Sequence, residues 1–224
     1  MGCDKILGVA SIAAAAVLLG LVAFDVPYFK SVYFLRIDLA GAAASTAGSP
    51  ATPYVDLGVL GFCTDLQNGL GLQCSPPKIG YSLSEASQFI NGSLPGILTS
   101  GVNVAAAALT KALVLHLAAL AIALGAFVFA LLALLGVPCI AECCADCFSG
   151  FAGATGFVVF VFDLAFFFLI KKRVDAESHA SSAVMGNAIW LTLAAMILLF
   201  ITPILFLVGR CCSGVGKVAY KPLK

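Results

Sequence analysis

Four long apolar runs alternate with polar segments along the chain. The runs are residues 6–24, 113–137, 153–170 and 186–208. Each has close to the roughly 20 residues that a helix needs to cross the hydrocarbon core of a bilayer. Each ends where a charged residue or a proline makes continuation costly. The pattern therefore predicts four membrane-spanning helices, with both termini on the same side of the membrane.

The first run has an alternative interpretation as a cleaved signal peptide, because Lys5 precedes it and alanines are frequent in it. However, the run is longer than a usual signal core, and its small residues lie inside it rather than after it at a cleavage site. We therefore expect it to be retained as a membrane helix.

The longest polar interval, from residue 25 to about residue 110, is long enough to form a small domain. Strands are expected where β-branched and aromatic residues are frequent, at residues 32–37, 54–63 and 73–81. Pro76 and Pro77 restrict the last of these to a sheet edge. Residues 42–53 predict a loop or hairpin. From Ser84 onward the interval is expected to be helical, with Ser84 as the cap.

The composition agrees with a membrane protein. Hydrophobic residues make up 62% of the 224 residues and charged residues only 10%, and the mean hydropathy is +1.09. These values lie far from those of soluble globular domains. The formal net charge of +1 gives no basic stripe of the kind that binds nucleic acid, so we expect no nucleic-acid partner.

The nine cysteines fall into two groups. Cys63 and Cys74 lie in the long polar interval, whereas the other seven lie within a few residues of an apolar run: Cys3, Cys139, Cys143, Cys144, Cys147, Cys211 and Cys212. A disulfide persists in an oxidising compartment, while clustered thiols stay reduced in the cytosol. We therefore expect a Cys63–Cys74 disulfide outside the cell and seven thiols inside. The alternative is a pair of free extracellular thiols.

The basic residues near the ends of the spans do not decide the orientation, because they are divided equally between the two sides and the cluster at residues 171–173 favours the opposite one. Asn91 begins an N-glycosylation sequon, which has chemical meaning only if the long interval enters the secretory lumen. Alternatively, Asn91 is an unmodified turn residue. The expected organisation is a cytosolic N-terminus (1–5), first span (6–24), extracellular loop domain (25–110), second span (111–137), cytosolic Cys-rich loop (138–152), third span (153–170), short extracellular loop (171–185), fourth span (186–208) and cytosolic tail (209–224).

The segment from Gly58 to Cys74 resembles the claudin-type signature. Its matching positions are Gly58, Val59, Leu60, Cys63 and Cys74. Leu60 stands where animal claudins have tryptophan. The closer match is to the fungal Sur/PalI family of claudin-like four-span membrane proteins, nearest the PalI-type branch and basidiomycete-like. It rests on residues 162–168 followed by the basic cluster, and on Gly186-Asn187-Ala188-Ile189-Trp190 and the residues up to Ala195.

The resemblance implies a left-handed four-helix transmembrane bundle with a small disulfide-stapled extracellular β-sheet and a short extracellular helix. It also implies a plasma-membrane accessory protein that assists a multi-span ambient-pH receptor. The alternative within the family is a Sur-type structural tetraspan, associated with eisosomes, that organises membrane domains and supports cell-wall integrity or cell fusion. The expected partners are the lipid bilayer and other membrane proteins or a second copy of the chain.

Seven cysteines are candidates for S-acylation, since thiols at the cytoplasmic ends of membrane helices are its usual substrates. They are Cys3, Cys139, Cys143, Cys144, Cys147, Cys211 and Cys212. Inert small residues and a zinc or iron–sulfur site are the alternatives, although four thiols within nine residues lack the separated pairs of a zinc knuckle and no histidine accompanies them. We expect no metal.

Asp163 is an ionisable residue inside the third span, where such a group normally faces the other helices and finds a partner. His116, Asn187 and Thr192 are the candidates at a similar depth. One hypothesis is a proton-responsive Asp163–His116 pair. The alternative is a neutral or hydrogen-bonded aspartate that only fixes the packing of the helices.

No catalytic constellation is expected. The chain has only two histidines, His116 in a span and His179 in a short loop, and a nucleophile, a base and an orienting group cannot be assembled from the remaining residues. Channel function is also disfavoured, because the spans lack charge rings and a carbonyl filter signature. We expect neither an enzyme nor a cofactor.

Overall fold

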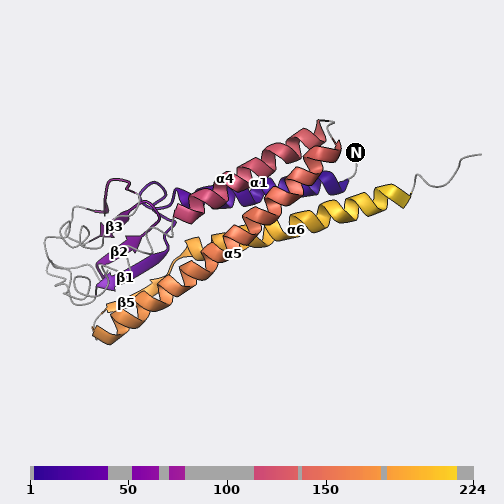
Figure 1. Ribbon diagram of the computed structural model, residues 1–224. Coiled ribbons are helices and arrows are strands. Elements are labelled where there is room, and N and C mark those ends of the chain that lie inside the picture. Colours follow the sequence, from indigo (N-terminus) through magenta and orange to yellow (C-terminus); the bar gives the residue numbers. More distant parts are fainter. Residues whose placement is uncertain are drawn as a thin grey trace, which may run out of the picture. The chain divides into compact units, whose positions relative to one another are not determined.

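The computed structural model describes residues 3–39, 52–65, 71–78, 114–135, 138–177 and 181–215. Within these residues there are four long helices, α1 (Cys3–Ala23), α4 (Val114–Leu134), α5 (Pro138–Glu177) and α6 (Asn187–Val215) (Figure 1). Each contains a segment long and apolar enough to cross a membrane: Ile6–Ala23, Val114–Leu134, Cys143–Leu169 and Asn187–Leu207. The four helices predicted from the apolar runs are therefore confirmed.

Helix α5 is much longer than the third apolar run. Residues 138–152, expected to form a loop, are instead its first turns. Pro138 is the first residue of the helix, a position where proline is favourable because its missing N–H would have no partner there. At the other end α5 continues past Ile170 to Glu177, since charged residues end a membrane span without ending a helix. Helix α6 likewise runs beyond the expected limit at residue 208.

In the described part of the chain, five strands form one antiparallel sheet in the order β4-β3-β2-β1-β5. They are β1 (Leu35–Leu39), β2 (Tyr54–Leu57), β3 (Phe62–Asp65), β4 (Gln73–Cys74) and β5 (Ser181–Met185). Figure 1 shows β1, β2, β3 and β5 side by side. The expected strand at 54–63 is two strands, because the chain turns where the N–H of Gly58 donates to the carbonyl of Gly61 over 2.9 Å. Strand β5 was not expected.

The register gives the sheet two different faces. Leu35, Ile37, Val55, Leu57 and Phe62 are buried on one face, in a core that also contains Phe166, Phe167 and Ile189. Arg36 pairs with Asp56, and Asp56 pairs with Cys63, so these three residues share the opposite face. The apolar face therefore fixes the sheet, and the other face carries its polar chemistry.

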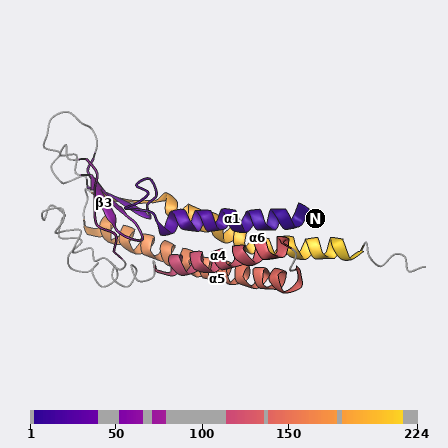
Figure 2. The ribbon, with the colours of Figure 1, turned by 90° about the horizontal axis from the view of Figure 1, so that it is seen from above.

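The chain forms two compact units. One is made from described parts of residues 1–19, 118–157 and 193–224, the other from residues 20–117 and 158–192. In the first unit, α4 and the beginning of α5 lie side by side (Figure 2), with the rings of Phe129 and Phe148 5.2 Å apart. Its core is rich in alanine, including Ala15, Ala123 and Ala195. Small residues let helix backbones approach closely where no hydrophobic driving force exists.

Candidate functional site

The carboxylate of Asp25 joins the end of α1 to the turn between β2 and β3. Asp25 is fully buried, and the backbone N–H of Val59 donates to it, 2.8 Å from Oδ1 and 3.1 Å from Oδ2. Burial raises the pKa of Asp25 well above its ordinary value, the hydrogen bond from Val59 opposes this, and the charge of Asp163 adds to it. The second unit thus holds a buried carboxyl that prefers to keep its proton.

The two glycines of the turn are required by close approach. A Cβ on Gly58 would lie 2.6 Å from Oδ1 of Asp25, and a Cβ on Gly61 would lie 2.6 Å from Oγ of Ser75. That hydroxyl accepts a hydrogen bond from the N–H of Phe62 over 3.1 Å. Any side chain at Gly58 or Gly61 would push on these acceptors, so the glycines allow the polar groups beneath the turn to reach the backbone.

His116 of α4 and Asp163 of α5 form a buried polar pair. Nε2 of His116 lies 3.2 Å from Oδ2 of Asp163, and their side chains are 1% and 3% exposed. The ring of Phe34 packs edge-on against His116, with the centroids 5.0 Å apart. Among the described residues, Nδ1 of His116 has no hydrogen-bond partner. Both side chains of the pair are thus removed from water, and an unpaired charge in such a place is expensive.

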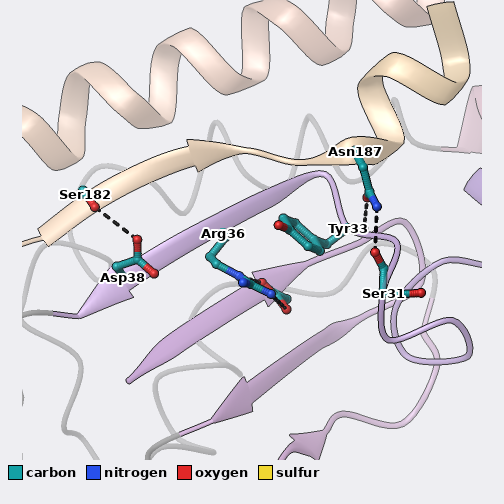
Figure 3. Close-up of polar contacts among 7 residues, drawn as sticks. Ser31, Tyr33, Arg36, Asp38, Ser182 and Asn187 are labelled. Carbon is teal, nitrogen blue, oxygen red and sulfur yellow. Dashed lines mark hydrogen bonds and ion pairs between the residues drawn. The ribbon is translucent and has the colours of Figure 1, made fainter. Parts of the chain in front are cut away.

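The other two residues expected near Asp163 have different partners. Thr192 donates to the carbonyl of Ala188 in its own helix over 3.1 Å. Asn187 accepts from the N–H of Tyr33 over 3.1 Å and donates to the carbonyl of Ser31 over 2.7 Å (Figure 3). Of the three candidates at the depth of Asp163, His116 is therefore the one that contacts it, whereas the contacts of Asn187 and Thr192 lie elsewhere. Asn187 instead ties the start of α6 to the segment that leads into β1.

On the polar face of the sheet, Arg36 lies between two tyrosine rings. Its guanidinium carbon is 4.5 Å from the ring centroid of Tyr33 and 4.2 Å from that of Tyr54. Nε and Nη2 of Arg36 also donate to the two carboxylate oxygens of Asp56, over 2.7 and 2.9 Å. Figure 3 shows Arg36 and Tyr33 together, with Ser182 of β5 donating to Asp38 over 3.2 Å. The hydrogen bonds to Asp56 raise the pKa of Arg36, so the guanidinium stays charged.

Cys63 and Cys74 form a disulfide, as predicted. The two residues face each other directly across β3 and β4, so the bridge fixes the two-residue edge strand. A strand this short has little other pairing to hold it.

The profile of the SUR7/PalI family matches residues 5–202. The chain belongs to the SUR7/PalI family. No curated protein matches it. The matched range includes the first three spans and most of α6, as well as the turn and the disulfide described above. Together with the four helices and the antiparallel sheet, this confirms the claudin-like four-span fold expected from the sequence, and it makes the chain a multi-pass membrane protein in contact with lipid.

Three of the seven thiols expected on one side of this SUR7/PalI protein have described side chains. Cys143, Cys144 and Cys147 are free; Cys143 and Cys147 are exposed and Cys144 is half-buried. They belong to the first unit, whereas the disulfide belongs to the second. The side chains of Cys3, Cys139, Cys211 and Cys212 lie outside the described part, as do Asn91, His179 and the expected helix from Ser84. In the described part, no three His, Cys, Asp or Glu side chains are grouped so that they could hold a metal ion.

Two features of the site were missed in the sequence. Asp25 follows directly after an apolar run, and this position indicates only a charge that ends a span. Arg36 and Asp56 are 20 residues apart, and only the register of β1 on β2 brings them together. The one available signal was the spacing of Gly58 and Gly61, since paired glycines in a strand pattern indicate a close approach of the backbone to other groups.

Proposed function

We propose that this chain is a non-enzymatic plasma-membrane protein that assists a multi-span ambient-pH receptor, as the resemblance to the PalI-type branch implies. The observation that carries the proposal is the buried His116–Asp163 pair, 3.2 Å apart within the spans. A histidine is the side chain whose ordinary titration lies nearest to physiological pH. A buried pair can change its charge only with a change in its surroundings.

Three titratable groups take part in the proposed response. Asp163 acts electrostatically on Asp25, and Asp25 holds the turn between β2 and β3 through Val59. The segment that leads into β1 packs the ring of Phe34 against His116, and this ring cannot titrate. A proton taken up or lost by the group of Asp25, His116 and Asp163 alters the hydrogen bonds that connect the spans to the sheet within this unit. A receptor bound beside the spans would sense that change.

The proposed orientation places the sheet outside the cell and both termini in the cytosol. Its support is the chemistry of the cysteines: the sheet carries a disulfide, which persists in oxidising compartments, while the described thiols of α5 are free. The sequon at Asn91 is consistent with the same orientation, because glycans are added in the secretory lumen.

The test is the pH dependence of the downstream response in cells that carry Asp163→Asn or His116→Gln in the full-length chain. We expect the pH at which the response is half-maximal to shift in both variants, with normal amounts at the cell surface. Thr192→Val is the matched control, because Thr192 is also buried but donates its hydrogen bond to the carbonyl of Ala188 in its own helix. An unchanged response in both variants at normal surface levels would refute the role of the pair.

A second candidate is a Sur-type protein that organises membrane domains and supports the cell wall. It is favoured by the exposed apolar side chains along α6, among them Ile197, Ile201 and Ile204, which offer a lateral surface to lipids or neighbouring proteins. Deleting the gene separates the two candidates. An alkaline growth defect relieved by activating the downstream pH pathway supports the first, while wall sensitivity with scattered membrane patches supports the second.

A further inference from the structure

Two thiols lie on the outward stripe of α5. Cys143 and Cys147 are one helical turn apart and both exposed. Phe151, which is 68% exposed, and the exposed Ala154 continue the same stripe at the spacing of 3.6 residues per turn. A group bonded to the sulfur of Cys143 or Cys147 would therefore lie along the apolar surface that α5 presents to lipid.

The opposite side of the same turns is packed against other helices. Ala141, Ala145, Ser149 and Ala152 are all buried, and Ser149 donates to the carbonyl of Leu199 in α6. Cys144 lies between the two sides and is half-buried. The thiols of Cys143 and Cys147 are thus accessible, whereas that of Cys144, their neighbour in sequence, is partly covered.

The two thiols also lie at the level of the membrane surface. The apolar part of α5, Cys143–Leu169, has 27 residues, more than the roughly 20 needed to cross the hydrocarbon core. Asp146 lies between the two thiols, and the next charged residue along α5 is Asp163. A charge is far less costly at the interface than at the bilayer centre, so the turn around Asp146 belongs at the boundary between lipid and water.

We propose that Cys143 and Cys147 are S-acylated with long-chain fatty acids and that Cys144 is not. The donor is an acyl-coenzyme A: a bond forms between Sγ of the cysteine and the acyl carbonyl carbon, the thioester bond to coenzyme A breaks, and the thiol proton leaves with coenzyme A as its free thiol. No oxidant is needed. The attached chains enter the bilayer beside α5, where every buried methylene adds to the membrane affinity of this end of the helix.

A metal site and a structural disulfide explain the two thiols less well. In the part of the chain with described side chains, Cys143, Cys144 and Cys147 do not form a group that could hold a metal ion, and all three are free thiols. The acylation rests on the proposed cytosolic side for this end of α5, because acyl-coenzyme A is a cytosolic donor, but it does not depend on a role in pH signalling.

The experiment counts acylated cysteines in the full-length protein in cell membranes. Free thiols are blocked with N-ethylmaleimide, thioesters are cleaved with neutral hydroxylamine, and the released thiols are tagged with polyethylene glycol maleimide. We expect Cys143→Ser and Cys147→Ser each to lose one tag and the double variant to lose two. Cys144→Ser, the matched control, loses none. A tag count that is unchanged in Cys143→Ser or in Cys147→Ser, or reduced in Cys144→Ser, overturns the proposal.

The orientation is measured separately, so that its failure can be distinguished. An antibody against a tag after Lys224 is applied to intact and to permeabilised cells. Binding only after permeabilisation supports the cytosolic side. Binding to intact cells refutes the proposed orientation and the acylation with it, whereas cytosolic termini with unchanged tag counts in the serine variants refute the acylation alone.

Discussion

The hydroxyl of Ser149 in α5 donates a hydrogen bond to the carbonyl of Leu199 in α6 over 2.9 Å. In a regular helix this carbonyl would accept from the N–H of residue 203, but that residue is Pro203 and has no N–H. Ser149 is fully buried. The serine of one helix thus supplies the donor that the proline of its neighbour removes, which satisfies a carbonyl where no water is available.

We expect Ser149→Ala to destabilise the protein by about 1 kcal/mol, since it leaves the carbonyl of Leu199 unpaired. In a Pro203→Ala background the same substitution should cost less, because the restored N–H of residue 203 then pairs with that carbonyl. The measurement is a double-mutant cycle on unfolding in mixed detergent micelles. Thr155→Val is the control, as Thr155 bonds within its own helix to Phe151. Equal costs of Ser149→Ala in both backgrounds would contradict the account.

Gly58→Ala should destabilise the second unit by about 1–3 kcal/mol, the usual cost of overpacking. The added Cβ would lie 2.6 Å from Oδ1 of Asp25, which is buried and cannot move without losing its hydrogen bond from Val59. Gly20→Ala is the matched control, because nothing lies within 4 Å of a Cβ placed there. Thermal unfolding of the two variants in detergent measures the difference. If the Gly58→Ala protein were as stable as the Gly20→Ala protein, the carboxylate of Asp25 would be able to move aside without loss of stability.

The pH dependence of stability should contain a contribution from Asp25. Burial raises the pKa of its carboxyl above the ordinary 3.8, so the folded protein binds this proton more tightly than the unfolded chain does. The resulting stabilisation is fully present below pH 3.8 and is lost as the pH rises through the raised folded-state pKa. Asp25→Asn is neutral at every pH. Its stability relative to wild type should therefore increase as the pH rises.

Unfolding midpoints of wild type and Asp25→Asn across a pH series test this. Ser75→Ala serves as the control, because it removes an acceptor under the same turn but no titratable group, so its difference from wild type should stay constant. A difference between Asp25→Asn and wild type that is constant, or that shrinks as the pH rises, would mean that the carboxyl is ionised in the fold without cost.

The helices could be predicted because a long apolar run is a local property of the chain. Their ends could not, since residues 138–152 interrupt the apolar pattern with charged residues and cysteines and are still good enough helix formers to continue α5. Strand β5 was missed for a different reason: it forms on the edge of β1, where Val184 pairs with Arg36. Because this pairing depends on a distant strand, the five residues of β5 carry little sequence pattern that would predict a strand.

The disulfide could be predicted from the sequence. So could His116 as a candidate partner of Asp163, because a membrane span offers few polar groups that can satisfy a buried aspartate. The same reasoning failed for Asn187, whose depth resembled that of Asp163 but whose side chain bonds the backbone at Tyr33 and Ser31. Depth along a helix follows from sequence. The direction in which a side chain points around the helix depends on packing that the sequence does not display.

Arg36→Lys should destabilise the sheet by about 1–2 kcal/mol although it keeps the positive charge. Lysine cannot make the paired hydrogen bonds that Arg36 makes to Asp56, and a compact ammonium cannot lie flat between the rings of Tyr33 and Tyr54. Arg36→Ala should cost more, because the side chain of Asp56 is only 2% exposed and would be left as an unpaired buried charge.

Thermal unfolding of the Arg36 variants measures these losses. Ser182→Ala is the comparison on the same face, since its hydrogen bond to Asp38 is exposed and should contribute less than about 0.5 kcal/mol. The order of stability should be wild type and Ser182→Ala, then Arg36→Lys, then Arg36→Ala. Because the side chain of Arg36 is itself 31% exposed, charge alone contributes little there. Full stability of Arg36→Lys would therefore mean that neither the paired geometry nor the stacking stabilises the sheet.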